Sequence, residues 1–313
     1  FRFSLKGSYT PRTYCVQYRE SDLAFVNRLL EEEGIFYFFE ATEDGEVLVM
    51  TDSGDGNVPL EGNDTLAFRE GDPGMRGGEQ VVSFHAARSL SVGAVSLKDF
   101  DFKKPGLALE SEVEGEDADK EANFVTQDYP GEYPNASIGD RLAKIRLEER
   151  RAERLLAIGE TDCRRLAPGY KFTLADHPRE ELNQEYLVVG VRHRGVQPQG
   201  GIGLQLDEEI YTCTFECIPA TTPYRAPRIT PRPAIEGLQT AIVVGPAGEE
   251  IHCDEHGRVK VKFHWDRTGT RDDKASCWIR VSQHWGGGGW GSMYIPRIGQ
   301  EVVIQFLEGD PDR

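Results

Sequence analysis

Histidine and cysteine, the side chains that most often hold zinc, gather in the last quarter of the chain. The candidates are His252, Cys253, His256 and His264. Structural zinc sites pair their ligands at short spacings that a turn can bring together, whereas an extended strand points neighbouring side chains to opposite faces. The spacing here therefore favours ordinary strand and turn residues, and we predict no metal site.

Six cysteines lie at positions 15, 163, 213, 217, 253 and 277, with no CxxC pair among them. Cys213, Phe215 and Cys217 fall on one face of an extended segment, which would place the two cysteine Cα atoms about 13 Å apart. A disulfide cannot bridge that distance. We therefore expect both thiols to be small core side chains in a protein of a reducing compartment.

Catalytic signatures are absent from the sequence, which contains no Gly-x-Ser-x-Gly elbow, no Cys–His signature and no phosphate-binding loop. The glycine run at residues 286–289, between Trp285 and Trp290, lacks the lysine and hydroxyl of a P-loop. A flexible barrel loop is the favoured interpretation, and a ligand clamp is the alternative. We predict no catalytic residue, no cofactor and no enzymatic activity in this chain.

The elements that would position these residues are short strands. In residues 257–267 apolar and polar side chains alternate strictly, so one face of a strand would be buried and the other solvated. The apolar members are Val259, Val261, Phe263 and Trp265, and the polar members are Arg258, Lys260, Lys262 and His264. Further strands are expected at residues 250–253, 277–282 and 301–306. With glycine turns between them, these strands predict a small Greek-key barrel of the OB type over residues 241–313.

Two long blocks resemble one protein family. HCDEHGRVKVKFHWDR and SCWIRVSQHWGGGGWGSMYIPRIGQEVVIQFLEGDPDR, which cover most of residues 252–313, closely resemble the OB module of VgrG, the trimeric spike protein of type VI secretion systems. RTYCVQYRESDLAFVNRLLEEEGIFYFF, residues 12–39, resembles the hub region of the same family, which is shared with the baseplate hub of contractile-tailed phages. Because both blocks occur in the family's order, the resemblance runs over nearly the whole chain.

Residues 13–51 predict a helix followed by a hairpin. Ser21 can cap a helix that runs to about Glu33, and Gly34 can end it. Strands at residues 35–39 and 47–51 would pair across a turn. The helix ends in three glutamates, residues 31–33, interpreted as a solvated end, with a contact to Arg or Lys of a neighbouring subunit as the alternative. The expected buried stripe of the helix is Leu23, Val26, Leu29 and Leu30.

The middle of the chain is rich in predicted strands, at residues 81–85, 91–102, 170–175 and 186–193. Residues 110–121 hold seven acids and one lysine, which favours an exposed loop. Ser137 and Asp140 resemble a capping box. The resemblance implies that this region is the hub barrel, with the helix and the acidic loop inserted into it. The apolar face of that helix would consist of Leu142, Ile145, Ala152 and Leu155.

The predicted fold class is mainly β with inserted helices: a phage-hub-like barrel region followed by a small OB-fold Greek-key barrel. Five prolines between residues 219 and 233 favour an extended, stiff linker. We expect a hub subdomain over residues 1–80 that is incomplete at its N-terminus, a hub β-barrel region over 81–218, the Pro-rich linker over 219–240, and an OB-fold spike-base domain over 241–313.

The net charge of the chain argues against two classes of function. The formal net charge of −17 opposes binding to nucleic acid or to an anionic membrane. No apolar run approaches the roughly 20 residues that a membrane helix needs. An OB-fold nucleic-acid-binding protein is one rival, because Arg258, Lys260 and Lys262 would share a strand face. A phage tail spike or the hub of an extracellular contractile injection particle is another, and a cell-wall hydrolase would need a paired-carboxylate domain beyond Arg313.

The resemblance implies a structural function. Three copies would form the hub and spike at the tip of a secreted tube, a puncturing device that carries effectors into target cells. The implied partners are two further copies of the chain, a hexameric Hcp-like tube protein, a PAAR-type tip protein with effectors, and baseplate components, without nucleic acid or stable membrane insertion. The protein would assemble in the bacterial cytoplasm and then be secreted without a cleaved signal peptide. Apolar strand faces of the hub, residues 35–39 among them, would lie near a subunit boundary.

Overall fold

The computed structural model describes residues 1–70, 78–116, 120–195, 211–267 and 272–313. Within this part the fold is mainly β with two α-helices, neither of which is long and apolar enough to cross a bilayer. Contacts divide the chain into two compact units. The first unit consists of Phe1–Gly7 and Leu29–Ile229, and the second unit of Ser8–Arg28 and Thr230–Arg313.

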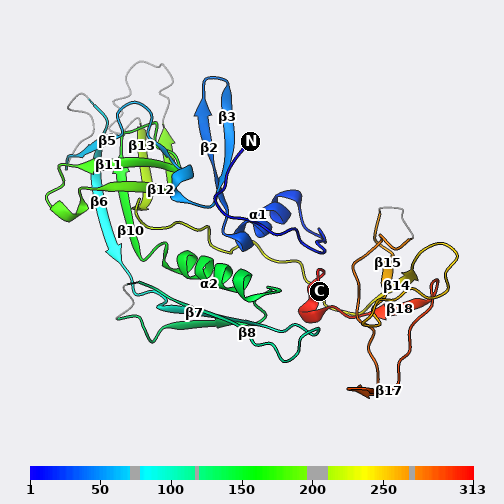
Figure 1. The fold of residues 1–313 in the computed structure, drawn as a ribbon. Coiled ribbons are helices and arrows are strands. Elements are labelled where there is room, and N and C mark those ends of the chain that lie inside the picture. The colour runs from blue at the N-terminus through cyan, green and yellow to red at the C-terminus, as the bar shows by residue number, and fades with distance from the viewer. Residues whose placement is uncertain (71–77, 117–119, 196–210, 268–271) are drawn as a thin grey trace. The chain divides into compact units, whose positions relative to one another are not determined.

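A closed barrel of six strands lies in the first unit (Figure 1). The strands pair in the order β12–β13–β10–β6–β5–β11, and β11 pairs back to β12, so the ring has no open edge. A short strand, β4, also pairs with β11. The bounds are β4 (Val58–Pro59), β5 (Thr65–Phe68), β6 (Gln80–Arg88), β10 (Leu155–Thr161), β11 (Tyr170–Ala175), β12 (Glu185–Gly195) and β13 (Tyr211–Pro219).

Alternate side chains of these strands fill the barrel interior. Along β11, Tyr170, Phe172 and Leu174 are buried, and the side chains between them are half-buried. Phe172 stacks on Tyr186 of β12 with ring centroids 5.9 Å apart. The strands predicted at residues 81–85, 170–175 and 186–193 are confirmed as β6, β11 and β12.

A three-stranded sheet packs against helix α2 (Ala136–Arg151) in the first unit (Figure 1). Its central strand β7 (Ala94–Asp99) pairs with antiparallel β8 (Leu109–Glu114) and with parallel β9 (Val125–Asp128). The strand predicted at residues 91–102 is thereby confirmed in a shorter form. The helix and the sheet share a core of Val95, Leu97, Leu109, Tyr133, Ala143 and Leu147.

The prediction of an exposed loop at residues 110–121 is wrong at both ends of the stretch, and residues 117–119 lie outside the described residues. The first part of this stretch belongs to β8, in which Leu109 and Ser111 are buried while the glutamates beside them are exposed. Because side chains alternate along a strand, one face can be entirely acidic without disturbing the core. At the other end of the stretch Glu121 is 1% exposed and binds the arginines Arg151 and Arg154 at 3.1 and 3.0 Å.

Helix α2 begins earlier than the predicted capping box. Asn135 is the N-cap, and its Oδ1 accepts a hydrogen bond from the Ile138 amide at 3.0 Å. The box of Ser137 and Asp140 is therefore wrong, since both residues lie inside the first turns. Leu155, expected on the apolar face of the helix, lies in β10.

Helix α1 (Asp22–Glu33) begins and ends as predicted. Ser21 Oγ accepts a hydrogen bond from the Ala24 amide at 3.2 Å, and Gly34 follows the helix with a φ of 70°. The predicted hairpin is also confirmed. Its strands are β2 (Phe36–Thr42) and β3 (Gly45–Thr51), and β1 (Arg2–Ser4) pairs in parallel with β3.

The predicted buried stripe of α1 is wrong in its first half. Leu23 is 64% exposed and Val26 is 43% exposed, whereas the charged Arg28 and Glu31 are buried. Arg28 turns inward because it forms an ion pair with Glu20 at 2.9 Å. Periodicity alone does not show such a pair, because the acid lies outside the helix.

The second unit contains a three-stranded sheet in the order β15–β14–β18. The strands are β14 (Gln239–Val244), β15 (Lys260–Phe263) and β18 (Glu301–Ile304), so the strands predicted at residues 257–267 and 301–306 are confirmed in a shorter form. The predicted alternation places Val259, Val261 and Phe263 in the core. The strand predicted at 250–253 is wrong, and the stretch 277–282 contributes a single bridge, between Ile279 and Val259.

The proline-rich stretch begins at the end of the first unit's barrel. Pro219 is still part of β13. Residues 220–238 contain neither helix nor strand, as the recurring prolines favour. One of the divisions between the two units falls within this stretch, after Ile229.

Candidate functional site

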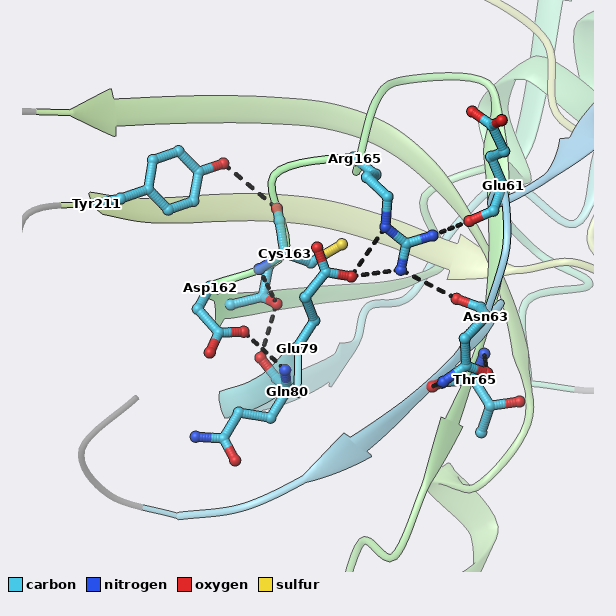
Figure 2. A network of polar contacts seen from close by, with 10 residues as sticks. Glu61, Asn63, Thr65, Glu79, Gln80, Asp162, Cys163, Arg165 and Tyr211 are labelled. Atoms are coloured by element: carbon cyan, nitrogen blue, oxygen red, sulfur yellow. Dashed lines mark hydrogen bonds and ion pairs between the residues drawn. The ribbon is translucent and has the colours of Figure 1, made fainter. Parts of the chain in front are cut away.

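Hydrogen bonds from one arginine, Arg165, connect the segments that flank strands β5, β6 and β10 (Figure 2). Arg165 Nε donates a hydrogen bond to Glu79 Oε2 at 2.9 Å, and its Nη2 donates to the Asn63 carbonyl at 3.1 Å. Its Nη1 donates to the Glu61 carbonyl. The hydrogen bond from Arg165 holds the pKa of the Glu79 carboxyl below its usual value. An ionised carboxylate that is paired with a guanidinium is poorly suited to general acid–base chemistry.

The Gln80 backbone, next to Glu79, is held by two polar side chains at the end of β10 (Figure 2). Thr161 Oγ1 donates to the Gln80 carbonyl at 2.7 Å, and Asp162 Oδ1 accepts from the Gln80 amide at 2.7 Å. The register of β10 on β6 shifts between Glu160 and Thr161. The side chains thus satisfy backbone groups next to a bulge, and the network braces the barrel.

The thiols of the barrel are unsuited to nucleophilic chemistry. Cys163 is completely buried, and burial raises the pKa of its thiol to about 11. Burial also raises the pKa of Cys213 to about 11, and it raises the pKa of Cys217. A thiol that stays protonated at neutral pH is a weak nucleophile. Cys213 and Cys217 belong to the barrel core, which confirms their prediction as core side chains.

A second network in the first unit joins α2 to the end of α1. Arg146 is 6% exposed and donates hydrogen bonds to the carbonyls of Glu31 at 2.8 Å and Glu32 at 2.6 Å. The same guanidinium pairs with Glu149 at 2.5 Å. Because the last carbonyls of a helix have no partner within the helix, the buried cation satisfies them and complements the helix dipole.

This network corrects the expectation for residues 31–33. Glu33 pairs with Arg141 of α2 at 2.7 Å, and Glu31 is 8% exposed. The end of α1 is therefore not solvated. The arginines that meet it come from α2 of the same chain.

Arg225, after β13, joins the same junction. Its Nη1 donates to the carbonyls of Gly34 at 2.9 Å and Asp52 at 2.6 Å, and its Nε pairs with Glu148 at 2.8 Å. Sequence reasoning missed this residue. It also missed Arg146 and Arg165. The one available signal was that Arg146 lies four residues after Leu142, on the apolar side of the helix.

The basic face of β15 is largely neutralised within the second unit. Arg258 pairs with Asp254 at 2.6 Å, and Lys262 pairs with Asp266 at 2.7 Å. The Lys260 ammonium lies 5.0 Å from the ring centroid of Trp278. A nucleic-acid interface needs cations that reach phosphates, so this pairing disfavours an OB-fold nucleic-acid site.

The residues first considered as zinc ligands have separate partners. The ring of His252 lies 5.0 Å from that of Trp278, and His264 Nε2 is 3.1 Å from Thr240 Oγ1. Cys253 is exposed, and His256 Nε2 lies 3.5 Å from a carboxylate oxygen of the adjacent glutamate. In the ranges that the structure describes, no three His, Cys, Asp or Glu side chains are grouped to hold a metal ion.

The glycine run forms a small hairpin, where a flexible loop was predicted. Its strands are β16 (Gly286–Gly287) and β17 (Trp290–Gly291). Trp285 and Trp290 are 61% and 56% exposed, with ring centroids 5.1 Å apart. The hairpin therefore displays two neighbouring aromatic side chains to solvent.

Strand β2, the candidate for a subunit boundary, turns most of its apolar side chains into the chain's own core. Phe36 and Phe38 are 6% and 3% exposed. Their rings lie 5.0 Å from Tyr224 and 6.4 Å from Tyr170, respectively. Of residues 35–39, Phe39 is the one that stays exposed, at 54%. Most of the apolar side chains of residues 35–39 are thus covered within the chain, and their place near a subunit boundary stays a prediction.

Two family models match the sequence in succession. Residues 1–199 match the model of the phage tail baseplate hub (GPD), which covers more than half of the chain. Residues 241–313 match the model of the type VI secretion system/phage-baseplate injector OB domain. The fold class predicted from the sequence is thereby confirmed: a mainly β hub region with a closed barrel, followed by an OB domain.

Curated spike proteins align with the entire chain. Type VI secretion system spike protein VgrG1b of Pseudomonas aeruginosa is 43% identical over 320 residues, which cover 100% of this chain and 42% of the relative. VgrG1c of the same species is 42% identical over 321 residues, 100% of this chain and 43% of the relative. VgrG3 of Vibrio cholerae is 39% identical over 323 residues, 100% of this chain and 31% of the relative. The chain thus spans less than half the length of these relatives.

A solved structure supports the fold. An E. coli component of the type VI secretion system, described as structurally similar to the T4 bacteriophage tail proteins gp27 and gp5, matches with a TM-score of 0.63 and 23% identity, over 99% of this chain and 63% of the other. The order of the two family models and the alignment with spike proteins over the full chain agree with this fold. The chain belongs to the phage tail baseplate hub family, and over its full length it is similar to VgrG-type spike proteins of type VI secretion systems.

Proposed function

We propose that this chain forms the hub and the spike base of a trimeric puncturing device at the tip of a secreted tube. The observation that carries the proposal is that one chain joins a baseplate-hub region to an injector OB domain, in the order found in spike proteins. Residues 1–80 and 81–218 would make the hub, residues 219–240 the linker, and residues 241–313 the spike base.

The polar networks support a mechanical role. A spike that is pushed by an external contracting sheath needs stiffness, and the arginines of the first unit bind strand ends and helix ends within one body. Their guanidinium groups bind backbone carbonyls and carboxylates of the same chain, and these contacts rigidify the fold. We therefore assign no chemical step to this part of the protein, and any hydrolytic or toxic activity would belong to a further domain or to a bound effector.

Exposed apolar side chains support assembly into a trimer. The first unit exposes Phe1 at 84% and Phe3 at 58%, and the second unit exposes Trp285 at 61% and Met293 at 70%. Large permanent interfaces are rich in such side chains. In a closed three-fold assembly every copy offers the same surfaces to its neighbours.

The proposed partners follow from this symmetry. The resemblance to the family implies a second barrel in the hub, similar to the closed barrel described above. Two such barrels per chain, repeated three times, would form a six-membered ring that seats a hexameric Hcp-like tube protein. A PAAR-type tip protein with its effectors and the baseplate components would complete the particle. Assembly would take place in the bacterial cytoplasm, and secretion would follow without a cleaved signal peptide.

A phage tail spike or the hub of an extracellular injection particle is the second candidate, because both family models also describe phage baseplates. Deletion of the gene distinguishes the two in a strain without a paralogous spike. Loss of both tube-protein secretion and contact-dependent killing, restored by a plasmid copy, is expected for a secretion spike. Continued secretion of the tube protein by the deletion strain would contradict the proposal.

A further inference from the structure

Segment Ser8–Arg28 groups with the second unit, although more than 200 residues separate it from Thr230. The family model of the baseplate hub spans this segment, as part of residues 1–199. The division by contacts therefore differs from the division by sequence similarity. The contacts of the segment show why.

Arg28 folds the segment back on itself. Its Nε and Nη2 donate to both carboxylate oxygens of Glu20 at 2.9 to 3.1 Å, and its Nη2 also donates to the Val16 carbonyl at 3.1 Å. The two charged side chains are 5% and 7% exposed. A buried, bidentate pair of this kind fixes the geometry of the segment and not merely its charge.

Val16 attaches the segment to the carboxyl-terminal end of the second unit. Its amide donates to Asp312 Oδ1 at 2.7 Å, and its side chain is buried. The acceptor is itself held in place, because the Asp312 amide donates to Asp310 Oδ1 at 2.8 Å. In the same turn the Ile235 amide donates to the Gly309 carbonyl at 2.8 Å. The segment thus meets an ordered turn.

Tyr18 extends the core of the second unit. Its ring lies 5.8 Å from that of Trp265, in an edge-to-face arrangement. The Trp265 indole donates to Gln239 Oε1 at 2.7 Å, and Gln239 Nε2 donates to Tyr18 Oη at 3.1 Å. One amide of β14 therefore connects the segment to the aromatic edge of the sheet. Tyr14 of the segment is also half-buried, and this burial is the main reason why the pKa of its phenol is raised to about 12.

We infer that Ser8–Arg28 is an integral strap of the second unit, which covers the aromatic edge of its core and holds the turn at Asp312. The chain consequently passes between the two units at three points, after Gly7, after Arg28 and after Ile229. The proline-rich stretch is thus one of three covalent connections between the units. This inference concerns the single chain, so it does not depend on the proposed trimer or its partners.

Tryptophan fluorescence provides a selective test on the full chain. All four tryptophans, at positions 265, 278, 285 and 290, lie in the second unit, so the midpoint of their unfolding transition reports that unit alone. Tyr18→Ala removes the aromatic contact and Asp312→Ala removes the hydrogen-bond acceptor. Asp312→Asn keeps an acceptor oxygen, and Glu255→Ala alters an acid whose side chain is 85% exposed in the same unit. Amide hydrogen exchange is measured in parallel.

Both strap variants should lower the fluorescence midpoint and speed exchange of the Val16 and Ile235 amides at least tenfold. Asp312→Asn and Glu255→Ala should leave both exchange rates within twofold of the unaltered protein. If Tyr18→Ala and Asp312→Ala left the fluorescence midpoint and the Ile235 amide unchanged, the segment would merely rest on the second unit, and the inference would be overturned.

Discussion

Replacing Val261 by aspartate is the sharpest test of how the second unit is built. Val261 is fully buried on β15, in a core shared with Val243 of β14 and Ile304 of β18. The substitution gives up about 1.5 to 3 kcal/mol of apolar burial. A carboxyl group left in an apolar site costs about 1 to 3 kcal/mol more. We therefore expect a loss of about 2.5 to 6 kcal/mol, a large share of the stability of a typical domain.

Val303→Asp is the matched control. Val303 lies on β18 of the same sheet and is 63% exposed, so the same chemical change there should cost no more than about 0.5 kcal/mol. Lys260 serves this purpose less well, because its ammonium packs over Trp278 and donates to the Asp273 carbonyl. Urea unfolding followed by tryptophan fluorescence measures both variants. Equal losses would show that the alternation of buried and exposed residues in this sheet has been misassigned.

Three further predictions concern the first unit and the thiols. Arg146→Met should lower the free energy of unfolding by about 3 to 5 kcal/mol, measured by thermal unfolding followed by circular dichroism, because it leaves buried acceptors unpaired. The control Lys144→Met, at a side chain 70% exposed, should lower it by less than about 0.5 kcal/mol. Equal losses would refute the network. The pKa of Glu79 is lowered from 4.5 in the folded state, so the stability that its ion pair contributes is complete above pH 4.5 and is lost as the pH falls through the lowered pKa. The difference in stability between the unaltered protein and Glu79→Gln should therefore shrink on acidification. A difference that stays constant with pH would contradict the pairing. Iodoacetamide should label exposed Cys253 in the native protein, but the cysteines at positions 163, 213 and 217 only after unfolding. Labelling of any of these three in the native protein, detected by mass spectrometry, would contradict their burial.

Much of the strand pattern could be predicted from the sequence, because alternation is a local property. The buried Val259, Val261 and Phe263 of the second unit follow directly from the period of two. The acidic composition of β8 suggests a loop, although its residues alternate as in a strand. In β8 the buried positions carry Leu109 and Ser111, and the exposed ones carry the charges.

The contacts that close each unit could not be predicted, because they join residues far apart in the chain. The parallel pairing of β11 with β5, which places Thr173 opposite Thr65, joins strands that lie far apart in the sequence and depends on the curvature of the whole sheet. The hydrogen bond from Val16 to Asp312 spans 296 residues and has no local signature. Exposed Leu23 and Val26 show the same limit, since helical periodicity identifies an apolar stripe but not the element that covers it.

The symmetry of the assembled protein tests the central claim most directly. An electron-microscopy reconstruction of the complete protein, with every domain that accompanies this chain in the cell, should show three copies around one axis. The hub regions should form a ring at one end, wide enough to seat a hexameric tube. A stable monomer or a dimer with two-fold symmetry would contradict the proposal that this chain is the hub and base of a puncturing spike.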